Sequence, residues 1–142
     1  MKVFVYGTLR TGDCRFGVNS FVEMIAPEAY IDGFEMLDLG GFPGLVKSEG
    51  DGRTTLPKIR GEVHEYEHLR ILDGIEGYRA SDPTAGHYNR IQVTVKTPDG
   101  EIENCWVYTL NGRPLQLRHY NVIESGDWFV HRGHYKNLEG QA

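Results

Sequence analysis

A carboxylate within an apolar stretch is the residue of this sequence that most clearly suggests chemistry. Residues 68–75 have the composition of a short helix, and four apolar side chains are predicted to share one face: Leu69, Ile71, Leu72 and Ile75. Glu76 follows Leu72 by four residues and Leu69 by seven, so it falls on that face, whereas Arg70 and Asp73 are predicted to point into water. Desolvation against apolar surface raises the pKa of a carboxyl group and suits it to proton transfer near neutral pH. Glu76 is thus a candidate general acid and base, unless the last helical turn frays and leaves it in solvent.

A second candidate lies at the start of the chain, where a strand leads directly into a loop. Residues 3–6 are β-branched or aromatic, which is typical of a buried strand, and Gly7 ends it. Glycine permits a positive φ and lets another molecule approach the backbone closely. The N–H groups of Thr8, Leu9 and Arg10 then form a possible nest for an anion. The alternative interpretation is an ordinary turn after the first strand.

Further candidates lie on the clearest strand, which is predicted over residues 88–96. Its apolar residues alternate with polar ones, so Tyr88 and Arg90 are placed on the face away from the core. Pro98-Asp99-Gly100 predicts a hairpin turn, and residues 101–110 form the return strand. Tyr88 and Arg90 are therefore either pocket residues or ordinary surface residues.

Composition restricts the class of protein. The chain has 142 residues, 39% of them hydrophobic and 25% charged, which predicts one globular domain over residues 1–142. The net charge of -5 and the absence of a basic run argue against nucleic acid as a partner. No apolar run is long enough to cross a membrane, and no signal peptide precedes the first strand. With only Cys14 and Cys105, a disulfide framework is excluded, and the reducing cytoplasm is the expected location.

The remaining elements predict a mainly β protein of the α+β class. A short helix is expected over residues 19–25, ended by Pro27, and further strands over residues 29–39, 45–47 and 59–66. A turn over residues 123–128 is expected to anchor Trp128 on the core. The predicted architecture is a mixed, barrel-like sheet with short helices beside it.

Two other kinds of site have weaker support. His64-Glu65-Tyr66-Glu67-His68 matches the zinc-peptidase pattern H-E-x-x-H, but that pattern requires a helix, and here it follows a predicted strand without a third ligand at a recognised spacing. Cys14 could serve a thiol hydrolase, although nothing near it in the sequence supports that role. No metal is expected.

The sequence resembles the γ-glutamylcyclotransferase family, in its γ-glutamylamine cyclotransferase-like, small bacterial branch. Four segments carry the resemblance, in the same order: Tyr6-Gly7-Thr8-Leu9-Arg10, Pro43-Gly44-Leu45-Val46, Leu72-Asp73-Gly74-Ile75-Glu76-Gly77, and Tyr88-Asn89-Arg90 followed by Val93 and Val95. The closing Glu124-Ser125-Gly126-Asp127-Trp128 fits the same branch. The chain departs from the family after Arg10, where Cys14-Arg15-Phe16 replaces a small polar run, so the leaving group of the substrate stays open.

The resemblance implies a mixed β-barrel that converts a γ-glutamylamine or γ-glutamyl-amino acid into 5-oxoproline and a free amine. It implies Glu76 as the catalytic acid and base, and the backbone of Gly7, Thr8 and Leu9 as the binding site of the γ-glutamyl group. The further pocket residues are Tyr6, Tyr88, Arg90 and Tyr108. It implies no cofactor, no partner beyond the small-molecule substrate, and a monomer or weak homodimer. The alternative is a catalytically silent member that only binds a small metabolite.

Overall fold

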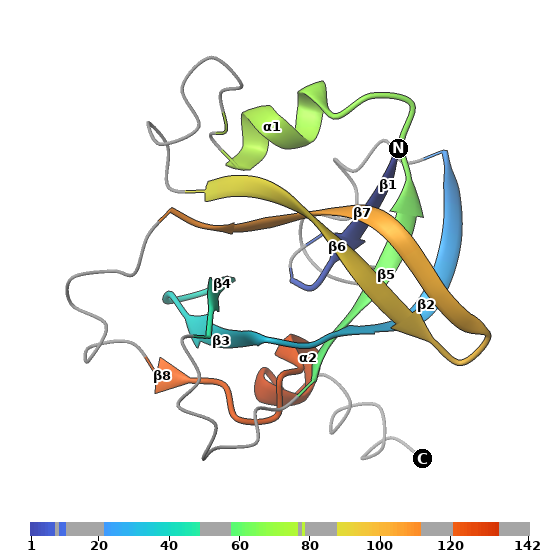
Figure 1. Ribbon diagram of the computed structural model, residues 1–142. Coiled ribbons are helices and arrows are strands. Elements are labelled where there is room, and N and C mark those ends of the chain that lie inside the picture. Colours follow the sequence, from blue (N-terminus) through green and yellow to red (C-terminus); the bar gives the residue numbers. More distant parts are fainter. Residues whose placement is uncertain are drawn as a thin grey trace.

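Strands form most of the computed structural model, which describes residues 1–7, 9–10, 22–48, 58–76, 78, 88–111 and 121–133 (Figure 1). The strands are β1 (Lys2–Val5), β2 (Glu23–Ile31), β3 (Phe34–Asp38), β4 (Pro43–Lys47), β5 (Ile59–Glu65), β6 (Tyr88–Thr97), β7 (Gly100–Leu110) and β8 (Asn121–Val122). The helices are α1 (Arg70–Glu76) and α2 (Trp128–His131). β6 and β7 form the predicted hairpin around the turn at residues 98–99.

Within the described part of the chain, five strands close into a barrel in the order β1-β5-β2-β6-β7. β1 runs parallel to β7, with Val3 opposite Trp106, and antiparallel to β5. The other neighbouring strands of the barrel are antiparallel, and β2 and β6 are paired only at Tyr30 and Lys96. The mixed, barrel-like sheet with short flanking helices predicted from the sequence is thus confirmed.

A smaller sheet in the order β4-β3-β8 lies beside the barrel, close to α2 (Figure 1). The carboxylate of Asp127 caps α2 by accepting hydrogen bonds from the backbone N–H groups of Phe129 and Val130. Trp128 and Phe129 are buried in the core, so the predicted turn does anchor Trp128.

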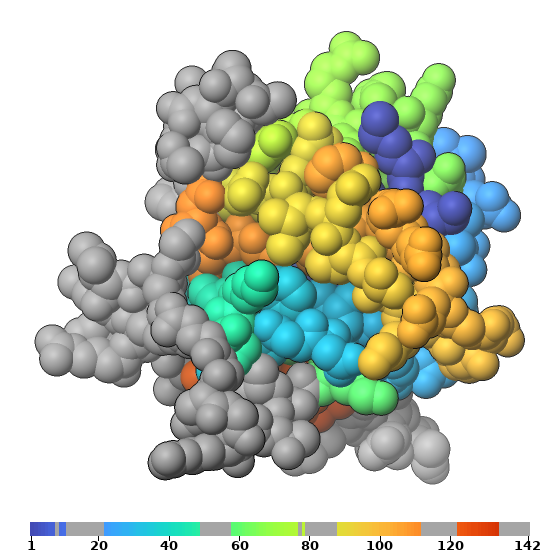
Figure 2. All heavy atoms as spheres, viewed as in Figure 1, coloured from blue at the N-terminus to red at the C-terminus, as the bar shows by residue number. Residues whose placement is uncertain are grey.

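The buried side chains form two clusters because the barrel strands are covered on both faces. Phe4, Val63, Val95 and Val107 belong to an inner cluster, which continues to the smaller sheet and α2. The outer cluster lies beneath α1 and consists of Val3, Val5, Leu9, Tyr66, Leu69, Leu72, Tyr88 and Tyr108. Figure 2 shows β6 and β7 across the middle of the face that is turned toward the viewer, above β2 and β3. Tyr88 therefore lies in a second core, so of the two alternatives that the sequence left open for it, a pocket residue or an ordinary surface residue, the exposed surface is excluded.

The helix predicted over residues 19–25 is wrong where the structure describes it, because Glu23, Met24 and Ile25 begin β2. Glu23 pairs with Glu65 and Met24 with His64 on β5. This pairing with a distant strand outweighs the local spacing that favoured a helix. Pro27 lies at an irregularity between Ala26 and Ala29, which is a position where a strand tolerates proline. In the described residues, no helix is long and apolar enough to cross a membrane.

Candidate active site

The loop after β1 depends on a close approach between Gly7 and Pro43. A Cβ atom added to Gly7 would lie 2.6 Å from Pro43 Cγ and 2.8 Å from its Cδ, which is closer than side chains tolerate. The φ of Gly7 lies outside the positive range, so glycine is needed here for space and not for a left-handed backbone, contrary to the expectation from sequence. The sequence signal for this contact is the Pro43-Gly44 segment, which the structure brings beside the loop.

Arg10 fastens the end of this loop to two distant parts of the chain. The residue as a whole is 1% exposed, and its Nη1 donates a hydrogen bond to Asp127 Oδ1 at 3.0 Å. Its Nε lies 3.6 Å from Glu62 Oε2, and its guanidinium lies 3.8 Å from the centre of the Phe129 ring. The Arg10 N–H donates to the Gly7 carbonyl at 3.0 Å, so it belongs to a turn and not to the anion nest predicted from the sequence. Thr8 lies outside the described residues.

Three tyrosines connect the loop to the strands beside it. The Tyr6 hydroxyl donates to the backbone carbonyl of Tyr108 at 2.6 Å, and the Tyr88 hydroxyl donates to the carbonyl of Pro43 at 3.2 Å. Leu9 packs in the outer cluster together with Tyr88 and Tyr108. The structure therefore brings together four of the predicted residues, which come from three separate segments: Tyr6, Leu9, Tyr88 and Tyr108.

Glu76 ends α1 and is half-buried, while Leu69 and Leu72 are buried beneath the same helix. Burial raises the pKa of Tyr6 well above its usual value, and the charge of Glu76 adds to this rise. The pKa of Tyr108 is raised chiefly by burial, then by its hydrogen bond to Asp73, and again in part by Glu76. The negative charge of Glu76 thus acts on both hydroxyl groups. Ile71 is 44% exposed, so it does not belong to the apolar face, contrary to prediction.

The prediction for Asp73 is also wrong, because this residue does not point into water. Its Oδ1 accepts a hydrogen bond from the Tyr108 hydroxyl at 2.6 Å and lies 3.5 Å from Arg90 Nη1. Asp73 follows Leu69 by four residues, so the helical period places it beside Leu69 at the edge of the buried face. That spacing is the signal by which sequence reasoning could have found it. Gly77 lies outside the described residues.

These residues form a candidate active site at one end of the barrel. It contains the carboxylate of Glu76, whose charge acts on the hydroxyls of Tyr6 and Tyr108. It also contains the loop that begins at Gly7 and the ion pair between Asp73 and Arg90. This arrangement suits proton transfer at a small substrate held against a loop backbone.

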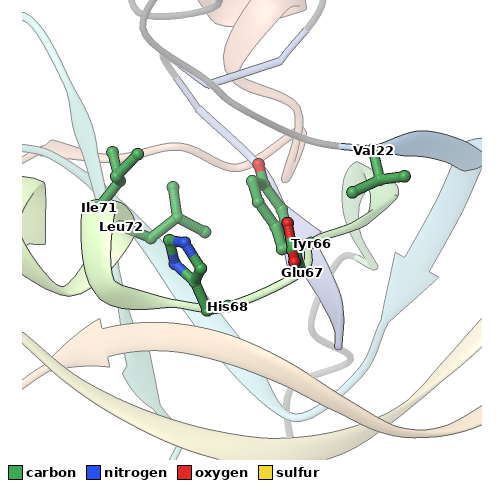
Figure 3. Close-up of a pocket in the computed structure, with 6 residues that line it drawn as sticks. All are labelled: Val22, Tyr66, Glu67, His68, Ile71 and Leu72. Carbon is green, nitrogen blue, oxygen red and sulfur yellow. The ribbon is translucent and has the colours of Figure 1, made fainter.

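The H-E-x-x-H pattern does not lie on a helix. His64 belongs to β5 and is buried, with its Nε2 2.9 Å from Glu62 Oε1 and its Nδ1 3.4 Å from the Tyr66 hydroxyl. His68 instead lines a pocket of about 110 Å³ beside α1 (Figure 3). The pocket is lined by Val22, Tyr66, Glu67, His68, Ile71 and Leu72. Among the residues that the structure describes, no group of three His, Cys, Asp or Glu side chains could hold a metal ion. Cys14 lies outside them.

Comparison with known proteins connects this geometry to a family. Residues 3–130 match the family described as "Gamma-glutamyl cyclotransferase, AIG2-like". A relative from Citrobacter rodentium, named gamma-glutamylcyclotransferase family protein ytfP, is 29% identical over 130 residues, which are 90% of this chain and 95% of that protein. A second relative, from Niallia circulans, is named gamma-L-glutamyl-butirosin B gamma-glutamyl cyclotransferase. It is 29% identical over 113 residues, which are 78% of this chain and 67% of that protein.

The fold is similar to that of a solved protein as well. The crystal structure of YkqA from Bacillus subtilis matches with a TM-score of 0.66 and 25% sequence identity. The match covers 96% of this chain but only 42% of YkqA, so the fold described above corresponds to part of that longer protein.

Proposed function

The chain belongs to the gamma-glutamyl cyclotransferase, AIG2-like family, and we propose that it cleaves a γ-glutamyl amide into 5-oxoproline and a free amine. Glu76 is the general acid and base of this reaction. The observation that supports the proposal most is the half-buried carboxylate of Glu76 at the end of α1, whose charge acts on the hydroxyls of Tyr6 and Tyr108, two residues that a hydrogen bond joins to each other where the loop at Gly7 begins.

The reaction is an intramolecular acyl transfer. The α-amino nitrogen of the substrate attacks its own γ-carbonyl carbon, a five-membered ring closes, and the bond from that carbon to the leaving amine breaks. An α-amino group has a pKa of about 8, so it is mostly protonated at neutral pH and must first lose a proton. Glu76 accepts this proton and returns one to the departing nitrogen. The ring nitrogen loses a second proton as the ring closes, and the released amine, which is an ammonium at neutral pH, takes it up, so that no proton is gained or lost overall.

Positioning is the other requirement of the reaction. Because the nucleophile and the carbonyl belong to one molecule, the protein must mainly hold the substrate in the folded geometry that closes the ring. In this proposal the backbone of the loop that begins at Gly7 holds the γ-glutamyl group and the oxyanion that develops on it. Tyr6, Leu9 and Tyr88, packed around the loop, keep that backbone in place.

The proposed substrates are γ-glutamylamines or γ-glutamyl-amino acids, in preference to glutathione. The Tyr6-Gly7-Thr8-Leu9-Arg10 form of the loop supports this choice, as does the relative whose name gives γ-L-glutamyl-butirosin B, and not glutathione, as the compound it acts on. Faster turnover of glutathione than of every simple γ-glutamyl amide would contradict it.

The test is release of 5-oxoproline from a panel of γ-glutamyl amides by the wild-type chain and by Glu76→Gln. The amide keeps the size of the side chain but cannot exchange protons, so we expect a rate lower by roughly 10²–10⁴-fold. The midpoint temperature of thermal unfolding should be unchanged or slightly higher in Glu76→Gln, because the substitution removes a partly desolvated charge. Glu103→Gln, the same change at an exposed position of β7, is the matched control. Near-normal activity of Glu76→Gln would refute the assignment, and binding without turnover by the wild-type chain would favour the silent alternative.

A further inference from the structure

Asp73 lies at the centre of a polar cluster between α1 and the hairpin of β6 and β7. Its side chain is 22% exposed, and the same oxygen, Oδ1, makes both its hydrogen bond with Tyr108 and its ion pair with Arg90. Tyr108, whose hydroxyl donates to that oxygen at 2.6 Å, is 4% exposed. A hydrogen bond from a buried hydroxyl to a carboxylate is among the stronger kinds of polar contact. The contact therefore fixes where the ring of Tyr108 lies.

Arg90 completes the cluster from the neighbouring strand. Arg90 and Tyr108 are direct partners in the pairing of β6 with β7, so their side chains lie side by side on one face. The guanidinium of Arg90 lies 4.8 Å from the ring centres of both Tyr78 and Trp106, which holds it over the sheet. Its Nη1 lies 3.5 Å from Asp73 Oδ1 and offsets the negative charge there.

Tyr108 also contacts the residue that precedes the loop, so its position affects the position of the loop. Its backbone carbonyl accepts the hydroxyl of Tyr6 at 2.6 Å, and Tyr6 directly precedes Gly7. A continuous series of polar contacts thus runs from α1 through Tyr108 to the loop. Asp73 and Glu76 are three residues apart on α1, so the contact that docks Asp73 onto Tyr108 also sets where Glu76 lies.

We infer that Asp73 is a positioning residue, which holds Tyr108 by its hydroxyl and thereby sets the distance between Glu76 and the loop that begins at Gly7. This inference rests on the proposed function and adds to it a residue that acts through Tyr108 without touching the substrate. Misplacement of a catalytic group by about 1 Å slows a reaction by roughly 10²-fold. Loss of the Asp73 carboxylate should therefore lower kcat and leave KM nearly unchanged.

The experiment compares kcat and KM for 5-oxoproline release by Asp73→Ala, Asp73→Asn, Tyr108→Phe and the double variant Asp73→Ala/Tyr108→Phe. We expect Asp73→Ala and Tyr108→Phe each to lower kcat by roughly 10- to 100-fold, with KM within about threefold of wild type. The double variant should be no slower than the slower single variant, because both changes delete one contact. Asp73→Asn should recover most of the activity, since its amide oxygen still accepts the Tyr108 hydroxyl.

Each other result overturns the inference in a recognisable way. Additive losses in the double variant would show that Asp73 does not act through Tyr108. Asp73→Asn as slow as Asp73→Ala would show that the charge, and not the hydrogen bond, matters. Normal kcat for Asp73→Ala would remove the role altogether. Arg70→Ala, an exposed change on the same helix, is the control and should retain wild-type rates. An inactive wild-type chain would overturn the proposed function, and this inference with it.

Discussion

Replacing Arg10 by methionine tests whether the loop of the candidate site is held by a buried charge. Methionine has a similar length but neither charge nor hydrogen-bond donors. The change deletes the 3.0 Å hydrogen bond to Asp127, the 3.6 Å ion pair with Glu62 and the contact with the ring of Phe129. Since Arg10 and Asp127 are 117 residues apart, their contact joins the first turn of the chain to its last described helix.

The loss of stability depends on which polar contacts Asp127 and Glu62 keep once Arg10 is removed. Removing one partner of a buried ion pair costs about 3–5 kcal/mol, because the other partner stays buried and unpaired. Here the cost should lie near the lower limit. Asp127 keeps its hydrogen bonds to α2 and the Nε of Arg60 at 3.9 Å, and Glu62 keeps His64 at 2.9 Å. We therefore expect Arg10→Met to lower the free energy of unfolding by about 3 kcal/mol and Tm by about 10 °C.

The assay is urea unfolding followed by far-UV circular dichroism, together with a thermal scan. Lys96→Met is the control, because Lys96 Nζ lies only 2.7 Å from Asp32 Oδ2 while both side chains are largely exposed. An exposed ion pair contributes little whatever its length, so the unfolding midpoint of this variant should not move measurably. If Arg10→Met is destabilised by less than about 1 kcal/mol, or by no more than Lys96→Met, the buried charge does not hold the loop.

Two further predictions concern glycine and cysteine. Gly7→Ala should lower the free energy of unfolding by about 1–3 kcal/mol, because the new Cβ meets Pro43 at 2.6 Å, and it should impair activity by moving the loop. Gly74→Ala should instead raise the free energy of unfolding by about 0.5–1 kcal/mol, since Gly74 lies within α1 and nothing lies within 4 Å of the added Cβ. Equal urea midpoints for Gly7→Ala and Gly74→Ala would contradict this pair of expectations. Burial raises the pKa of the Cys105 thiol to about 11, so in a Cys14→Ser background it should react with an aromatic disulfide at pH 8 only after unfolding. Because the pKa of the thiol is higher in the folded state, the stability that the neutral thiol contributes is fully present below the ordinary thiol pKa and should be lost as the pH rises through about 11. Rapid labelling of the native protein at pH 8 would disprove the burial of Cys105.

The sequence by itself determined those features that depend on local spacing. The alternation from Tyr88 onward and the turn at residues 98–100 were enough to predict the hairpin, because a strand repeats every two residues and the turn residues favour one geometry. The same kind of argument placed Glu76 on the buried side of a helix with Leu69 and Leu72, since residues three, four and seven apart share a face.

Only the tertiary structure decided which face of each element is covered, and by what. Local spacing allowed either Asp73 or Ile71 at the edge of the buried face of α1, and only the docking of α1 on the outer cluster decided that Asp73 is held there and Ile71 is exposed. Pairing with β5 turned residues 23–25 into a strand. The partners of Gly7 and Arg10 lie far along the chain, at Pro43 and at Asp127. Periodicity reports how side chains are distributed around one element, whereas such contacts depend on how separate elements are placed in space, which no local pattern encodes.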